Sequence, residues 1–446
     1  MISWRRYTIF LFTALLLLAG CSGEKAILPD MTKDGKGVVK VMYFHEQSFH
    51  QKYGDLFAIK YPDIEIEVVG MDLLRDYSKE EKPGERLNQF IEKENPDLIL
   101  VDAEQLTALA EKGKLLPLDA VLKQERFNTA GIPSLTMDFF RQLGGGHIYA
   151  LSPTYNVEAI YYNADLFREH GIEPPRNQMT WEELFELASR FGQLGTEEKP
   201  LYGLSTLFSN PMSILMNVTQ TKELRMIDSQ GEKMQFDSDG WKEAYRVVSD
   251  AITTNGLYMP DAKVTSISMN ETPFVRKQSA MMINSPTSSK ALQGNSTFEV
   301  GIVTMPVNPA NPGVSPFMSF NEMFAINSNS ANKRIAWELL SYMCSPEMAK
   351  TLVSGYSLSL PIRNEGIAEI GGLPAEPFTM LKPYAEGGPS RNVLERVKAS
   401  PEFNAQIYQT MSQTLISIVK DDKPVEEALA AMQKELQERL ELEKKK

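Results

Sequence analysis

Apolar residues recur along this chain in short runs that alternate with amphipathic stretches. Residues 38–42 and 64–69 have the apolar content and alternation of strands, and residues 97–101 form a continuous apolar run, typical of a strand buried on both faces. Helical patterns over 84–94 and 104–112 stand between and after these strands. Strands that alternate with helices predict an α/β fold with a mostly parallel sheet.

Further helices are predicted in the rest of the chain. Thr180 and Glu183 have the spacing of a capping box, so a helix begins after Thr180. Apolar residues at helical spacing predict helices from about 239 to 256 and from about 333 to 344. A last helix over about 424–444 has proline at its start and acidic residues in its first turn, which suits the helix dipole.

The first twenty residues follow another pattern. Arg5 and Arg6 precede an almost wholly apolar run over residues 7–20, and Leu-Ala-Gly stands directly before Cys21. This run is shorter than the roughly 20 residues of a membrane-spanning helix, and its order is that of a secretory signal peptide. The junction resembles a bacterial lipobox, which implies cleavage after residue 20 and lipid on Cys21. An ordinary signal peptide followed by a chance cysteine is the alternative. Residues 21–37 predict a flexible tether.

The bulk composition narrows the possible functions. A chain of 446 residues exceeds one core of typical size, so two or more lobes are expected. The net charge of −12, without a basic run, argues against nucleic acid as a partner. Only two cysteines are present, and Cys344 lies in an apolar helical pattern, so we predict a buried thiol and no disulfide framework.

Motifs of common enzyme chemistries are absent from the sequence. There is no His-Glu-x-x-His pair, no Gly-x-Ser-x-Gly turn and no phosphate-binding Gly-Lys-Ser/Thr loop. The four histidines are too scattered to propose a zinc site. We therefore predict no catalytic residue, no metal and no cofactor.

Several sequence blocks follow one another over nearly the whole chain. They are 95–101 (NPDLILV), 113–119 (GKLLPLD), 147–153 (HIYALSP), 159–167 (AIYYNADLF), 180–184 (TWEEL), 280–284 (AMMIN), 300–306 (VGIVTMP) and 336–340 (AWELL). In this order and spacing they resemble the extracellular solute-binding proteins of ABC importers, the family that includes maltose-binding protein.

The resemblance implies an α/β, two-lobed, type II periplasmic-binding-protein-like fold with interlaced lobes and a central cleft. We expect the first lobe to comprise residues 38–154 plus 305–325 and the second 155–304 plus 326–446. The chain is expected to cross between lobes near 153–157, 303–306 and 324–327.

Candidate ligand contacts follow from loops at the carboxyl ends of strands and from the lobe crossings. Those after the first and third strands are Glu46, Gln47 and Glu104. Those at or before the crossings are Tyr155, Asn156, Ser319, Asn321 and Glu322. Thr287 follows an Asn-Ser-Pro turn, and Tyr408 lies where relatives place an aromatic wall. A solvated loop residue is the alternative for each.

One departure from the family concerns the ligand. Maltose-binding relatives place a tryptophan that stacks on sugar where this chain has Thr287, and three of its four tryptophans match scaffold positions. The resemblance still implies a small solute, most often a carbohydrate, delivered to ABC permease subunits by a lipid-anchored monomer outside the cell membrane. A sensor or adhesion lipoprotein that reuses the fold, and a surface hydrolase, are the alternatives.

Overall fold

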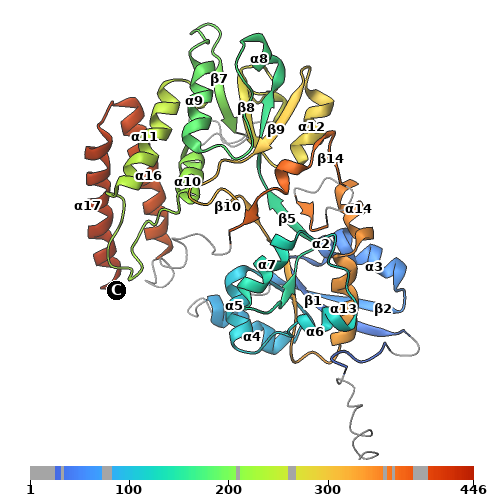
Figure 1. The fold of residues 1–446 in the computed structure, drawn as a ribbon. Coiled ribbons are helices and arrows are strands. Elements are labelled where there is room, and N and C mark those ends of the chain that lie inside the picture. The colour runs from blue at the N-terminus through green and yellow to red at the C-terminus, as the bar shows by residue number, and fades with distance from the viewer. Residues whose placement is uncertain are drawn as a thin grey trace, which may run out of the picture.

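Two sheets, each covered by helices, form two lobes that short strands connect (Figure 1). The computed structural model describes residues 26–31, 35–72, 83–206, 211–259, 268–354, 359–363, 367–384 and 400–445. Cys21, the predicted signal peptide and Trp4 lie outside the described residues.

The first lobe, which is the lower one in Figure 1, is built on a five-stranded sheet of order β2-β1-β3-β12-β4. Its strands are β1 (Gly37–Tyr43), β2 (Ile64–Gly70), β3 (Leu98–Val101), β4 (Ala150–Leu151) and β12 (Met323–Ile326). β1 pairs in parallel with β2 and β3, whereas β12 runs antiparallel to β3 and β4. All four β3 residues are buried, as the continuous apolar run predicts.

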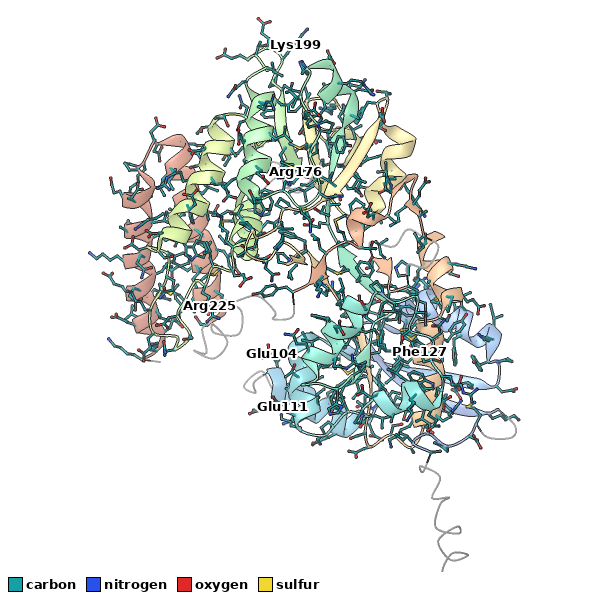
Figure 2. The ribbon with its side chains drawn as sticks, in the orientation of Figure 1. Glu104, Glu111, Phe127, Arg176, Lys199 and Arg225 are labelled. Carbon is teal, nitrogen blue, oxygen red and sulfur yellow. The ribbon has the colours of Figure 1, made fainter. Side chains whose placement is uncertain are left out.

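Helices cover this sheet. They are α2 (Glu46–Phe49), a π-helix (His50–Gly54), α3 (Asp55–Lys60), α4 (Pro83–Glu94), α5 (Ala103–Glu111), α6 (Asp119–Gln124), α7 (Ser134–Leu143), α13 (Lys333–Met343) and α14 (Pro346–Ser354). Phe127, labelled in Figure 2, is partly buried and packs against this core, and its ring meets Trp337 edge-on with centroids 5.5 Å apart.

The second lobe has a four-stranded sheet of order β7-β8-β6-β9. Its strands are β6 (Ala159–Asn163), β7 (Tyr202–Thr206), β8 (Ser279–Asn284) and β9 (Val300–Thr304). Its helices are α8 (Ala164–Glu169), α9 (Trp181–Gly192), α10 (Pro211–Thr221), α11 (Asp239–Thr253), α12 (Thr287–Asn295), α16 (Pro401–Lys420) and α17 (Val425–Glu443). The predicted capping box at the start of α9 is present, with Thr180 and Glu183 bonded reciprocally to backbone N–H groups.

A three-stranded sheet joins the lobes, and we call it the hinge sheet. It consists of β11 (Met318–Ser319), β5 (Thr154–Val157) and β13 (Leu360–Pro361), with β5 in the middle and both neighbours antiparallel to it. The remaining short elements are β10 (Val314–Ser315), β14 (Glu369–Ile370), β15 (Leu373–Pro374), β16 (Lys382–Pro383) and the 3₁₀ turns Met269–Glu271 and Glu376–Phe378.

The packing of α13 and α14 differs from the expected division of the chain, which placed all of 326–446 in the second lobe. Ile335, Trp337 and Leu339 of α13 belong to the hydrophobic core of the first lobe, and so does Met348 of α14. The third crossing is β13, whereas the expected one at 324–327 is an interior strand of the first sheet. The reason is that β12 pairs with β3 and β4, after which α13 packs against β1 and β12, and α14 packs against α13.

Part of the expected tether packs against the first lobe. Leu28 is buried, and the Gln124 amide joins its backbone on both sides: Oε1 accepts from Leu28 N over 3.3 Å, and Nε2 donates to Leu28 O over 3.0 Å. The described residues 26–31 therefore belong to the lobe surface. Cys344 is buried as predicted, and burial raises the pKa of its thiol to about 12.

Candidate functional site

In both lobes, the edge of the sheet at which β3, β8 and β9 end faces the hinge sheet. In the first lobe β12 begins opposite Val101, the last residue of β3. In the second lobe Ala159, the first residue of β6, pairs with Asn284 at the end of β8 and with Thr304 at the end of β9. Because β5 leads directly into β6 and β11 leads into β12, the two edges lie on either side of the same crossing (Figure 1). Ligands of open α/β sheets bind at such carboxyl ends.

A cavity of about 970 Å³ lies at this place, on the second-lobe side of the hinge sheet. We call it the cleft cavity. Its lining comes from the end of β5, α10, the β8–α12 turn and the segment before β11. The lining residues are Asn156, Val157, Glu158, Asn217, Gln220, Met269, Asn284, Ser285, Thr287, Ser288, Lys290, Ala291, Gly294, Pro316, Phe317 and Ser319.

Neutral hydrogen-bonding groups make up most of the polar lining. The hydroxyls of Ser285 and Thr287 are 2.8 Å apart, and Asn156 Oδ1 accepts from Ser359 Oγ over 2.5 Å. The Tyr161 hydroxyl donates to the Ser285 carbonyl over 2.8 Å, which fixes the turn between β8 and α12. Amides and hydroxyls offer both donors and acceptors, the combination that a polar uncharged solute requires.

The cleft cavity contains two charged side chains of opposite sign among its described lining. Burial raises the pKa of Glu158, and no other group contributes to that shift. The Lys290 ammonium donates to the Val353 carbonyl over 2.8 Å and lies on an exposed side chain. The site therefore combines many neutral partners with one half-buried carboxylate.

The three described tryptophans are scaffold, as predicted. Trp181, Trp241 and Trp337 are almost completely buried, and Trp181 Nε1 donates to Thr221 Oγ1 over 2.9 Å. Phe317 supplies the aromatic surface of the described lining, with its ring edge-on to Trp181.

The structure brings three of the predicted contacts together in the cleft cavity: Asn156, Thr287 and Ser319. Ser319 pairs with Asn156 across the hinge sheet, and Thr287 begins α12. Tyr155 lies beside them in sequence but is buried, with its ring against Phe320 at 6.2 Å between centroids.

The other predicted contacts are not part of the described cavity lining. Glu46 and Gln47 are exposed in α2, just beyond the carboxyl end of β1. Glu104 is exposed at the start of α5, and Figure 2 shows it at the edge of the first lobe that faces the second. Asn321 is exposed beyond β11, and Tyr408, 46% exposed, lies on α16.

Glu322 instead has protein partners. Its carboxylate accepts from the hydroxyls of Tyr43 and Tyr53, each over 2.5 Å, and from Lys52 Nζ over 2.6 Å. Thr154 Oγ1 of β5 lies 3.3 Å away. Burial raises the pKa of this carboxyl, but Lys52 and the donated hydrogen bonds outweigh burial and hold the pKa below its usual value. These contacts tie the start of β12 to β1, the π-helix and the hinge strand.

Several lining residues were missed by the sequence analysis. Asn284 and Ser285 belong to the Asn-Ser-Pro turn that precedes the predicted contact Thr287. Asn217 and Gln220 are three residues apart on α10, a spacing that places them on one helix face but equally fits a solvated face. Glu158 stands two residues after Asn156. Side chains two positions apart on an extended strand share a face, so the prediction of Asn156 as a contact was the signal that could have indicated Glu158.

The described residues contain no group of three or more His, Cys, Asp or Glu side chains placed to hold a metal ion. None of their helices combines the length and apolar composition needed to cross a bilayer.

Comparisons with known proteins agree with this architecture. The model of the family described as bacterial extracellular solute-binding protein matches residues 45–350. A protein of Brucella abortus (strain 2308), described in its name only as a binding protein, is 25% identical over 316 residues, which cover 66% of this chain and 70% of its own.

Solved structures show the same fold at lower identity. The sugar-binding protein MalE of Xanthomonas citri is 15% identical with a TM-score of 0.62, covering 91% of this chain and 97% of its own. A solute-binding protein of Agrobacterium vitis S4 with bound D-mannitol is 18% identical with a TM-score of 0.52, covering 91% and 98%. These neighbours have the type II periplasmic solute-binding fold that the sequence predicts. The chain belongs to the family of bacterial extracellular solute-binding proteins.

Proposed function

We propose that this solute-binding protein captures a small carbohydrate or polyol in the cleft cavity and delivers it to the permease of an ABC importer. The observation that carries the proposal is the cavity beside the hinge sheet, in which amide and hydroxyl side chains stand among apolar residues such as Val157 and Phe317. Such groups can exchange their hydrogen bonds with water for bonds to sugar hydroxyls. The names of the Xanthomonas and Agrobacterium proteins, a sugar-binding protein and one holding D-mannitol, support this class of ligand.

The contacts that we propose for the ligand are the predicted residues that line the cavity, together with Asn217, Gln220, Asn284 and Ser285. Asn156 and Ser319 would bind from the hinge sheet, and Thr287 from the start of α12. Glu46, Gln47 and Glu104 lie beyond carboxyl ends of first-lobe strands, where they would reach the ligand once the lobes close.

Anchoring is a separate part of the proposal. The charged start, the apolar run and Leu-Ala-Gly before Cys21 support a lipid anchor at the extracellular face of the membrane, where we propose that the protein acts as a monomer. One acyl chain anchors only marginally, so two or more are expected on Cys21. Mass spectrometry of the amino terminus of protein from membranes tests this, and an unmodified Cys21 there contradicts it.

A hydrolase receives less support from the site. Most glycoside hydrolases use a pair of carboxyl groups, and Glu158 is the one carboxylate of the described cavity lining.

The test of the carbohydrate proposal is a thermal-shift screen with hexoses, hexitols and di- and trisaccharides, using the full chain in detergent. A ligand at about 100 times its Kd stabilises the folded state by about 2.7 kcal/mol, which moves the midpoint by a few degrees. We expect at least one member to raise the midpoint in a concentration-dependent way. No shift with any member at millimolar concentration contradicts the carbohydrate proposal.

A further inference from the structure

Glu158 lines the cleft cavity from the crossing between the lobes. It stands between β5 and β6, where the chain leaves the hinge sheet and enters the second lobe. Its neighbour Val157 pairs with Met318, and its other neighbour Ala159 pairs with Asn284 and Thr304. Because strand pairing fixes the backbone on both sides, the point from which the Glu158 side chain enters the cavity is set by the hinge sheet and the second-lobe sheet.

The Glu158 carboxylate has no ion-pair or hydrogen-bond partner among the described residues, and burial is the single cause of its raised pKa. Glu322, at the other crossing, is the natural comparison. That carboxylate accepts three hydrogen bonds of 2.6 Å or less, one of them from an ammonium. Glu158 is half-buried, so water still reaches its carboxylate in the empty protein, and a ligand that fills the cavity would displace that water. A carboxylate in this position points to a partner that arrives with the ligand.

The chemistry of the remaining lining indicates which partner this is. Hydroxyl groups of a ligand already find neutral donors and acceptors in Asn217, Gln220 and Asn284. A hydroxyl can also donate to a carboxylate, but an ammonium adds the attraction between opposite charges to the hydrogen bond, and that attraction is stronger where the cavity excludes part of the water. Lys290, the one basic residue of the described lining, has its ammonium on the Val353 carbonyl. The net charge of −12 further favours the approach of a cation.

We infer that the ligand is a polyhydroxylated molecule with a protonated amino group, an amino sugar in chemical class, whose ammonium binds the Glu158 carboxylate while its hydroxyls bind the amides and hydroxyls of the cleft cavity. This inference rests on the proposed function and narrows its class of ligand.

The test uses ligand pairs that differ only in the amino group, measured by titration calorimetry on the full chain in detergent. Three pairs are monosaccharides: glucosamine and glucose, galactosamine and galactose, and mannosamine and mannose. The fourth pair consists of two disaccharides, the β-1,4-linked dimer of glucosamine and cellobiose, which is the corresponding dimer of glucose. We expect the amino member of at least one pair to bind about 10- to 100-fold more tightly. N-acetylglucosamine, which has lost the positive charge, should bind about as weakly as glucose.

The variant Glu158→Gln keeps the shape of the side chain and removes its charge, so it should fold normally and lose the preference for the amino member. Glu169→Gln, an exposed position on α8 outside the cavity, is the matched control and should keep that preference. Two results overturn the inference and leave the proposed function standing: neutral sugars that bind as tightly as their amino counterparts, or a preference that survives in Glu158→Gln. If no member of any pair binds at millimolar concentration, the inference and the carbohydrate proposal both fall.

Discussion

Removing the Glu322 carboxylate should destabilise the first lobe strongly. Three donors converge on it within 2.6 Å, from Tyr43, Tyr53 and Lys52, and in Glu322→Ala all three lose their acceptor. Breaking a buried pair typically costs about 3–5 kcal/mol, because the remaining partner is left without compensation. The Lys52 side chain is 24% exposed, so water recovers part of the loss and we expect about 3 kcal/mol. Glu322→Gln keeps an acceptor oxygen and should cost about 1–2 kcal/mol.

Urea unfolding followed by tryptophan fluorescence measures this cost as a shift in midpoint at unchanged slope. Glu65→Ala is the control, since Glu65 is an exposed glutamate on β2 of the same lobe and its removal should change stability by less than about 0.5 kcal/mol. A double-mutant cycle with Lys52→Met should give a coupling of about 0.5–3 kcal/mol. If Glu322→Ala costs no more than Glu65→Ala, the carboxylate is not the structural tie that its contacts indicate.

Four further outcomes are expected. Since the folded-state pKa of Glu322 is lowered, the contribution of its carboxylate to stability is complete above the unfolded pKa of about 4.3 and is lost as pH falls toward the folded pKa. Urea midpoints measured between pH 6 and 3 should therefore fall more steeply for the wild type than for Glu322→Gln. Parallel curves for the two proteins refute this. Thr180→Ala removes the cap of α9 and should cost about 1 kcal/mol in thermal unfolding, whereas an unchanged midpoint would mean that the capping box contributes nothing. Asn156→Ala and Thr287→Ala should each weaken ligand binding about 5- to 150-fold by calorimetry, and unchanged affinity in both would move the site elsewhere. Saturating ligand should reduce the radius of gyration in small-angle scattering, because closure must be favoured by binding, and a constant radius contradicts closure about the hinge sheet.

The elements of this fold that depend on nearby residues could be predicted from the sequence. The apolar run of β3 indicated a strand buried on both faces, and Thr180 with Glu183 indicated the start of α9. Both signals are local. A strand buried on both faces is recognised from a short run of apolar residues without alternating polar ones, and a capping box is recognised from two residues three positions apart. The order of blocks then carried the resemblance to a two-lobed binding protein.

The parts that depend on distant pairing could not be predicted in the same way. The apolar face of α13 shows that the helix is half-buried, but not which of two sheets it covers. Its place in the first lobe follows from β12, which pairs with β3 and β4. The third crossing likewise depends on the pairing of Leu360 with Tyr155, two residues far apart in sequence.

The residues of the candidate site also differ in whether the sequence could predict them. Asn156 and Thr287 were predicted because a lobe crossing and the carboxyl end of a strand are places where topology brings loops together. The α10 residues were not, because their helix lies far from the hinge in sequence and its polar positions resemble an ordinary surface. Glu322 was assigned to the ligand on the same reasoning as Asn156, and only the positions of Tyr43, Tyr53 and Lys52 distinguish the two.

The two glutamates at the crossings show why residue type alone does not assign a role. Glu322 follows β11 and Glu158 follows β5, so both stand at equivalent points where the chain passes between lobes. Donors from β1 and the π-helix satisfy Glu322 before any ligand arrives, and its pKa falls; none of the described residues does so for Glu158, and its pKa rises. A carboxylate that is already satisfied can hold the crossing in place but has little left to offer a ligand, whereas the half-buried Glu158 carboxylate, which water can still reach in the empty protein, is available to a ligand. Substitution of Glu322 should therefore change stability with little effect on ligand selectivity. Substitution of Glu158 should change ligand selectivity with little effect on stability.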